Sequence, residues 1–246
     1  MAARLIFHDV EQGSDEWHQL RSGVLSGSDA HLLMVKPRNK SEQWSEGAKT
    51  LARKIVAERL LGKPLDGQLR LNRETGEFYT DNFESGAMAW GKYHEKESLI
   101  LLNEQFDLNF KQVGFVETEG MKRGCSPDGY DDLGIVLEMK HENTEKVIGY
   151  FDNPMELWDS HKWQCIHNML ELQCKEVILS ARDPRLPEPL NNKFAFIRMS
   201  LNDNVIIKKE EKDGYDFVKD VVDYKIRSES FLFYVDELMN KILNLA

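Results

Sequence analysis

Three residues that could perform metal-assisted chemistry stand close together near the middle of the chain. Asp128 lies in a Pro-Asp-Gly turn sequence, and Glu138 and Lys140 lie in the segment 135–140. The β-branched and aliphatic residues that open this segment predict a strand, on which Glu138 and Lys140 share one face. The turn can fold Asp128 back beside that strand. We therefore expect two carboxylates and one ammonium group to meet at one end of a sheet.

These side chains suit the binding of a hard cation. Mg²⁺ prefers oxygen ligands and keeps several waters, so two carboxylates are a sufficient contribution from the protein. A lysine beside them can hold the attacking water and offset charge on a phosphate. The set therefore indicates metal-dependent hydrolysis of a phosphodiester. The same pattern also occurs on surface hairpins with solvated charges, so the spacing alone leaves both interpretations open.

Composition limits the class of protein. Of 246 residues, 41% are hydrophobic and 30% are charged, which is typical of a single globular domain spanning residues 1–246. With neither a long apolar run nor a signal-peptide core, the chain is expected in the cytoplasm. Cys125, Cys165 and Cys174 lack metal-type spacing and are expected to be reduced thiols. The net charge of −10 argues against binding of nucleic acid through diffuse basic charge, but does not exclude a nuclease whose carboxylates bind metal ions.

Periodicity predicts a small sheet flanked by helices, which is an α/β or α+β fold. Helices are expected within residues 15–35 and over residues 47–61, 84–105, 155–173 and about 214–245. Strands are expected at residues 111–117, 135–140, 177–180 and 194–200. Residues 36–47 are polar and predict a loop, and the Gly, Pro, Asp and Asn residues within 62–83 predict an exposed excursion. Trp17 and Trp90 are expected to pack in the core.

Four blocks of sequence occur in the order seen in the phage lambda exonuclease family, and the chain resembles that family. The blocks are Glu11-Gln12-Gly13 with Trp17-His18, Leu20-Arg21, Gly23-Val24 and Ser28; Ala89-Trp90-Gly91-Lys92 with Glu95; Cys125-Ser126-Pro127-Asp128-Gly129 with Leu137-Glu138 and Lys140; and Gln164 in a later helix. Each block is weak alone, and their shared order is the stronger signal. The C-terminal third shares only a helical character with the family.

The resemblance implies a restriction-endonuclease-like core and a defined activity. The expected enzyme is a Mg²⁺-dependent 5′-to-3′ exonuclease, with Mn²⁺ as a substitute ion, that degrades one strand of double-stranded DNA from its ends. The resemblance also implies a homotrimeric ring and a role in phage recombination together with a single-strand annealing protein. For a phage-encoded protein the location would be the host cytoplasm.

The resemblance also gives roles to individual residues around the cation. Asp128 and Glu138 would be metal ligands, together with the main-chain carbonyl of Met139. Lys140 would act on the attacking water and the scissile phosphate. Glu95 would be a further acidic ligand or would orient water, although an exposed helix glutamate is the simpler alternative.

Other side chains would lie near the phosphates. Gln164 forms a polar stripe with His161 and Asn168 on one helical face, which suits either an active site or a solvated surface. The family's contacts to the 5′-phosphate end fall on Arg21, Ser28, Ser126 and Lys146. Guanidinium, hydroxyl and ammonium groups all suit phosphate oxygens. A helix cap at Ser28 and ordinary surface roles for the others are the alternatives.

The chain departs from the lambda pattern in places. His161 replaces a tyrosine, Ile166 replaces a second glutamine, and residues 141–143 replace a Cys-Pro-aromatic stretch. The first two changes leave the metal-binding residues intact but put the hydrogen bonding around the scissile phosphate in question. The third affects how the segment towards Lys146 would approach the DNA. A strand-separating loop is expected within residues 62–83. Three other functions stay open: a structure- or sequence-selective endonuclease, a catalytically silent DNA-end or protein-binding scaffold, and a hydrolase of another phosphoester.

Overall fold

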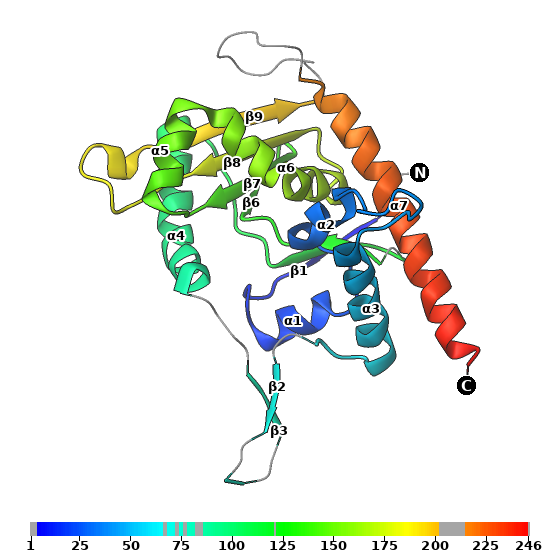
Figure 1. Cartoon of the computed structure of the whole chain (residues 1–246). Helices are drawn as coiled ribbons and strands as arrows, with labels where there is room; N and C mark the ends of the chain where they lie inside the picture. The colour runs from blue at the N-terminus through cyan, green and yellow to red at the C-terminus, as the bar shows by residue number, and fades with distance from the viewer. Residues whose placement is uncertain are drawn as a thin grey trace.

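The computed structural model describes residues 4–65, 68–71, 74–75, 78–81, 86–120, 122–201 and 215–245. Two small sheets, one hairpin and their surrounding helices form the α/β arrangement expected from the sequence (Figure 1). The helices are α1 (Asp15–Arg21), α2 (Ala30–Met34), α3 (Glu46–Leu61), α4 (Gly86–Phe106), α5 (Thr144–Asp152), α6 (Pro154–Glu171) and α7 (Phe217–Leu243), with the 3₁₀ turns η1 (Gly27–Asp29) and η2 (Leu190–Asn192). The strands are β1 (Leu5–His8), β2 (Gln68–Leu71), β3 (Phe78–Asp81), β4 (Phe115–Thr118), β5 (Gly124–Cys125), β6 (Gly129–Tyr130), β7 (Ile135–Lys140), β8 (Glu176–Ala181) and β9 (Ala195–Ser200).

The central sheet has the strand order β6-β7-β8-β9, with β7 parallel to β8 and the outer pairs antiparallel. Strand β7 coincides with the predicted strand and is buried on both faces, which explains its almost continuous aliphatic sequence. Leu137 and Met139 pack with Leu102 of α4 on one face. Val136 packs with Ile166 of α6 on the other face. In Figure 1, α6 crosses in front of this sheet.

The second sheet has the order β1-β4-β5 and lies beside the first. Strand β1 pairs antiparallel with β4, and β4 pairs with β5 through Val116 and Cys125. The strand predicted at residues 111–117 begins later than expected, because Lys111 makes only an isolated bridge to Tyr130. Strand β1 was not predicted, since four residues are too few to show a clear period.

Local signals explain where the two best-defined helices begin and end. Ser45 caps α3 by accepting a hydrogen bond from the Ala48 N–H, and Gly62 ends the helix with a left-handed φ of 65°. Asn153 caps α6, and Pro154 occupies its first turn, where a missing N–H causes no loss. Helix α6 therefore starts where α5 ends. Helix α5 itself was not predicted from the sequence.

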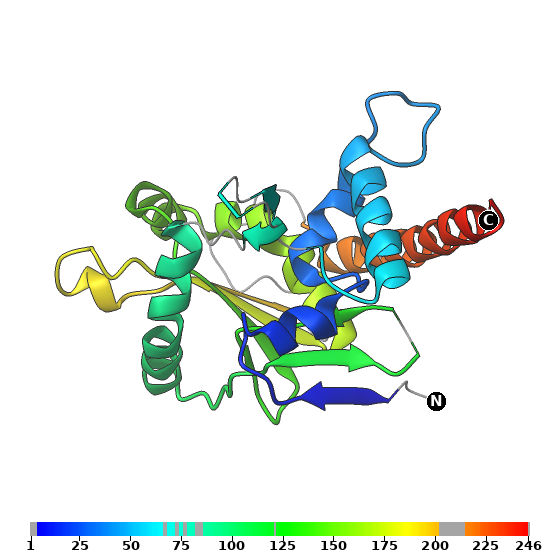
Figure 2. The same cartoon turned by 90° about the horizontal axis from the view of Figure 1, so that it is seen from below.

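A separate hydrophobic cluster joins α3 to α7. Trp44, Leu51 and Ile55 pack against Phe231 and Val235 of α7. Figures 1 and 2 both show α7 running beside α3 and continuing past it towards the C-terminus. This cluster fixes α3, and with it one wall of the cavity described below.

The exposed excursion predicted at residues 62–83 contains two strands that were not predicted. Strands β2 and β3 form an antiparallel hairpin there, which extends away from the rest of the chain in Figure 1. Other parts of this segment, where a strand-separating loop is expected, lie outside the described residues. The last helix begins at Phe217, and the predicted start at residue 214 also lies outside them.

Two predictions from composition can be compared with the structure. Cys125, Cys165 and Cys174 are buried free thiols. Among the described residues, no helix combines the length and apolar character needed to cross a membrane.

Candidate active site

Asp128 lies beside β7, as the sequence predicts, but the Pro-Asp-Gly sequence is not the turn that places it there. Asp128 directly precedes β6, and the chain turns at residues 131–134, where the Gly134 N–H donates to the Asp131 carbonyl at 3.1 Å. Strand β6 pairs with β7 in an antiparallel register that brings Asp128 opposite Glu138. Asp128 Oδ2 accepts a hydrogen bond of 2.6 Å from the main-chain N–H of Met139. This bond fixes the Asp128 carboxylate at the end of the strand.

Glu138 and Lys140 point from β7 towards α6, on the opposite face from Met139. The Lys140 ammonium donates to Glu138 Oε1 at 2.6 Å and to Gln164 Oε1 at 3.1 Å. Gln164 in turn donates from Nε2 to Glu138 Oε1 at 2.5 Å, and Asn168 donates from Nδ2 to Glu138 Oε2 at 2.9 Å. Glu138 is only 2% exposed, so these bonds replace the water that its charge would otherwise require.

Negative charge accumulates at this end of the sheet. Burial raises the pKa of Asp128 well above its ordinary value, and the neighbouring Glu138 and Glu95 carboxylates raise it further. Burial alone would lower the pKa of Lys140, but Glu138 and Asp128 raise it, so the ammonium stays charged at neutral pH. The Lys140 ammonium therefore faces the carboxylates of both Glu138 and Asp128.

Glu95 reaches this group from α4. Burial raises its pKa, and the charge of Glu138 adds to this effect, while a hydrogen bond of 2.8 Å from Gln112 opposes it. Glu95, Lys92, Asp128 and Lys140 all line one cavity. The structure thus brings the predicted acidic helix residue to the same place as the strand residues.

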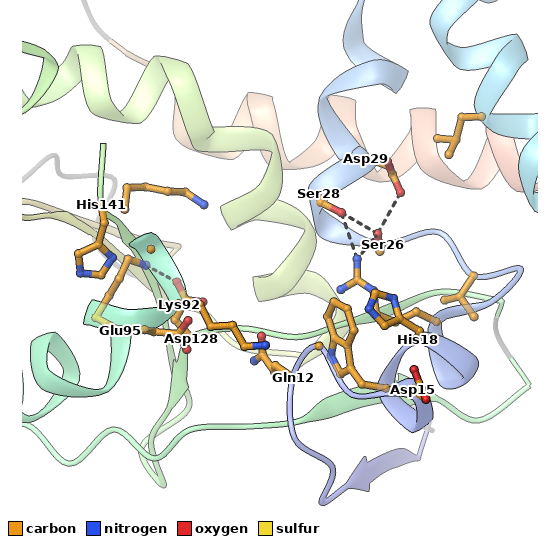
Figure 3. Close-up of a pocket in the computed structure, with 18 of the residues that line it drawn as sticks. Gln12, Asp15, His18, Ser26, Ser28, Asp29, Lys92, Glu95, Asp128 and His141 are labelled. Atoms are coloured by element: carbon orange, nitrogen blue, oxygen red, sulfur yellow. Dashed lines mark hydrogen bonds between the residues drawn. The ribbon is translucent and has the colours of Figure 1, made fainter. Parts of the chain in front are cut away.

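The cavity has a volume of about 940 Å³ and extends from the acidic group to α1, η1 and α3. Figure 3 shows Lys92, Glu95 and Asp128 on one side and Ser26 and Ser28 on the other. Gln12 lies between the two groups in this view, where it donates hydrogen bonds to the carbonyls of Val113 and Pro127. The space is within the range of about 300–1,000 Å³ that is usual for small-ligand sites.

The second end of the cavity is rich in hydrogen-bond donors. Arg21 Nη2 donates to Ser26 Oγ at 3.1 Å and to Ser28 Oγ at 3.2 Å, and its guanidinium lies 4.1 Å from the ring centre of Trp17. Ser26 Oγ also donates to Asp29 at 3.0 Å. Arg21 and Ser28, which were predicted from the resemblance, therefore stand together, and Ser26 was not predicted.

The other two predicted phosphate contacts lie elsewhere. Ser126 accepts a hydrogen bond of 2.9 Å from Trp17 Nε1 and so lies behind that ring. Lys146 is 58% exposed on its side chain and pairs with Glu142 at 3.0 Å. The prediction that Trp17 packs in the core is wrong, because the ring is part-buried and lines the cavity. Trp90 is also only part-buried, with its ring 4.1 Å from that of His94.

Comparison with protein families agrees with this arrangement. A model of the YqaJ-like viral recombinase domain matches residues 16–171, which include both ends of the cavity. The chain belongs to this family. The family and its fold make the protein a nuclease of the lambda exonuclease type, as the sequence blocks indicated. A comparison with curated protein sequences gives no match.

Solved structures of exonucleases share the fold. An alkaline exonuclease from Laribacter hongkongensis, LHK-Exo, is 17% identical, with a TM-score of 0.61 over 95% of this chain and 100% of that one. A structure of LHK-Exo in complex with dAMP gives 16% identity and a TM-score of 0.64 at the same coverage. A phage-related exonuclease from Haemophilus somnus is 15% identical, with a TM-score of 0.58 over 92% and 99% of the two chains. These exonucleases have the restriction-endonuclease-like fold, which confirms the predicted core.

Membership of a family of metal-dependent nucleases suggests a divalent metal ion, and the residues fit one. The described residues contain no group of three or more His, Cys, Asp or Glu side chains placed to hold a metal. Asp128, Glu138 and the Met139 carbonyl nevertheless form a set of oxygen donors, which Mg²⁺ prefers and completes with water. Burial, Glu138 and Glu95 all raise the pKa of Asp128, and a bound cation would oppose this by favouring the charged carboxylate.

The structure also shows residues of the candidate site that the sequence did not assign. Asn168 had been placed in the polar stripe with Gln164, and both bond to Glu138. His161 of the same stripe lies near Glu142 instead, at 3.7 Å. The spacing of Gln164 and Asn168, one helical turn apart, was the sequence signal that both side chains could reach the same group. The role of Ser26 depends on how η1 packs against α6, which no sequence pattern reveals.

Proposed function

We propose that this protein is a 5′-to-3′ exonuclease that degrades one strand of double-stranded DNA from its ends and leaves 3′ single strands for phage recombination by annealing. The observation that carries this proposal is one cavity with a carboxylate–lysine group at one end and a guanidinium–hydroxyl group at the other. The second group would bind a terminal phosphate and so set the distance from the DNA end at which the first group cuts.

The proposed metal ligands are Asp128, Glu138 and the main-chain carbonyl of Met139. Mg²⁺ bound there would activate a water, neutralise developing charge and stabilise the leaving 3′-oxygen. Mn²⁺ is expected to substitute, since carboxylate and carbonyl oxygens suit both ions.

Lys140 is proposed to contact the scissile phosphate. The neighbouring Glu138 and Asp128 carboxylates raise its pKa and favour the ammonium, which can donate hydrogen bonds to the attacking water and offset charge on the phosphate. Its bonds to Glu138 and Gln164 fix the ammonium before the DNA arrives. Glu95, whose pKa is raised, would accept a proton from the attacking water more readily than an ordinary glutamate does.

The 5′-phosphate is proposed to bind at Arg21, Ser26 and Ser28. The guanidinium can fork onto phosphate oxygens, and the hydroxyls can turn to donate to them. Ser126 would support this site through Trp17. Lys146 could bind phosphate only after leaving Glu142, so its role is the least direct of those proposed.

The wider setting is also a proposal. As in the lambda exonuclease family, we propose one nuclease domain per chain, a homotrimeric ring around the duplex and a single-strand annealing protein that receives the product strand. A phage-encoded enzyme of this kind would act in the host cytoplasm.

Time-resolved digestion of duplex DNA labelled at either end tests the proposal. With Mg²⁺ we expect mononucleotides from 5′-phosphorylated ends, slower release from 5′-hydroxyl ends, and no release with a chelator. Cleavage of a covalently closed plasmid would favour an endonuclease instead. DNA-end binding without any nucleotide release would favour a silent scaffold.

A further inference from the structure

The two ends of the cavity are joined behind its wall by a contact between α6 and η1. Asn168 of α6 is 1% exposed and donates to Glu138 Oε2 at 2.9 Å. Gly27 of η1 lies between Ser26 and Ser28, the two hydroxyls that face Arg21. A methyl group built on Gly27 would lie 2.4 Å from Asn168 Oδ1 and 3.3 Å from Gln164 Cγ. The turn formed by Ser26, Gly27 and Ser28 is therefore in direct contact with Asn168 and Gln164, the two α6 residues that hold Glu138.

The orientation of the Asn168 amide follows from its partner. A carboxylate oxygen only accepts, so the amide nitrogen must face Glu138. Asn168 Oδ1 then faces η1, and it is buried without a hydrogen-bond partner among the described residues. Buried polar atoms are almost always paired, and exceptions in native proteins often serve a function. Because Asn168 Oδ1 makes no hydrogen bond, the bond from Nδ2 to Glu138 is the polar contact that explains an asparagine at this buried position.

The close approach of Asn168 also explains why residue 27 is a glycine. Gly27 is in a 3₁₀ turn and is not among the described glycines with positive φ, so alanine would fit its backbone. Such a change normally stabilises a protein slightly, because it restricts the unfolded chain. The close approach of Asn168 Oδ1 opposes it, since a short buried amide bonded to Glu138 cannot move aside easily.

We propose that Asn168 is a positioning residue that holds Glu138 in the conformation needed for cation binding, and that its contact with Gly27 ties this conformation to the Ser26–Ser28 turn. The inference rests on the proposed function, because it assigns Asn168 a part in that reaction. Its consequence is that movement of the Ser26–Ser28 turn is transmitted to a catalytic carboxylate through the Asn168 amide.

The first test is Asn168→Leu, which keeps the branching at Cγ but removes the donor. We expect kcat on 5′-phosphorylated duplex to fall at least tenfold, while KM for the DNA end changes less than about threefold. The rise in melting temperature of the DNA-free protein on adding Mn²⁺ should also shrink. Unchanged kcat together with an unchanged Mn²⁺-induced rise would overturn the role of Asn168.

The second test is a double-mutant cycle of Gly27→Ala and Asn168→Ala, which isolates their coupling. Gly27→Ala alone should lower kcat, but in the Asn168→Ala background it should change kcat less than about twofold, because the atom it strikes is gone. Gly86→Ala is the matched control, since a methyl group there meets nothing within 4 Å. An equal loss from Gly27→Ala in both backgrounds, or no loss in either, would overturn the link.

The two proposals fail in different ways. If the wild-type protein releases no nucleotide from duplex DNA, the proposed function is wrong, and the Mn²⁺-induced melting shift still tests Asn168. If the wild type is active and Asn168→Leu matches it in both measurements, only the present inference is wrong.

Discussion

Lys140→Met provides the sharpest test of the site, because it removes the ammonium and keeps most of the side-chain stem. The ammonium lies 2.6 Å from Glu138 Oε1 and is the nearest cation to a carboxylate that is 2% exposed. Removing one partner of a buried ion pair costs about 3–5 kcal/mol. Gln164 and Asn168 still donate to Glu138, so we expect the lower end of that range.

The stability effect can be measured by melting the DNA-free protein in the presence of a chelator. For a chain of this size each kcal/mol corresponds to about 2–4 °C, so the variant should melt roughly 6–12 °C below the wild type. Adding Glu138→Gln should recover much of this loss, since it removes the uncompensated charge. Lys111→Met is the matched control: this lysine pairs with Asp132 at 2.9 Å but is 61% exposed, and its loss should cost less than about 1 kcal/mol.

The same variant tests the chemistry. Loss of one donor to a developing oxyanion lowers kcat by about 10²–10³, and loss of the cationic charge adds to this, so cleavage should fall at least about a thousandfold. Affinity for a 5′-phosphorylated end, measured with a chelator, should stay within about threefold. Wild-type nucleotide release, with an unchanged melting temperature, would refute the assignment of Lys140.

Three further predictions concern other parts of the molecule. Arg21→Gln should raise KM about tenfold or more for 5′-phosphorylated ends and leave 5′-hydroxyl ends unaffected, because a charge-assisted bond to phosphate is lost; equal effects on both substrates would exclude a phosphate contact. Glu95→Gln should lower single-turnover cleavage at least tenfold without weakening DNA-end binding, since the group lines the cavity beside Asp128. Burial lowers the pKa of His167, so the folded protein favours the neutral imidazole. Below about pH 6.5 the free energy of unfolding, measured by urea titration, should therefore fall by up to about 1.4 kcal/mol per pH unit. His167→Gln should make this free energy less dependent on pH.

The sequence predicts the strand and its acids well because their signals are local. The aliphatic run of β7 and its alternation place Glu138 and Lys140 on one face. Asp128 lies beside them as predicted, although the turn at residues 131–134 brings it there and not the Pro-Asp-Gly sequence. Order along the chain then adds Glu95 and Gln164, although they come from different helices. All of these residues have a proposed catalytic role that requires a particular side chain, and this makes them recognisable in the sequence.

Features that depend on tertiary packing are less accessible. Trp17 was expected in the core because it is large and apolar, but α1 contains no buried residue and its tryptophan lies on the cavity wall. Helix α5 buries only Val147 and Tyr150, which is too few to give a helical period. Gly27 lets η1, which carries Ser28 and follows Ser26, come close to Asn168 of α6, and this contact depends on tertiary packing.

The bond from Asp128 to the Met139 main chain has a consequence for mutagenesis. Asp128 closes the open end of a hairpin as well as carrying charge, so truncation to alanine would fray the strand that presents Glu138 and Lys140. Asp128→Asn keeps an oxygen for that N–H and changes only the charge. A comparison of the two variants would separate the architectural contribution of this carboxylate from its contribution to bond cleavage.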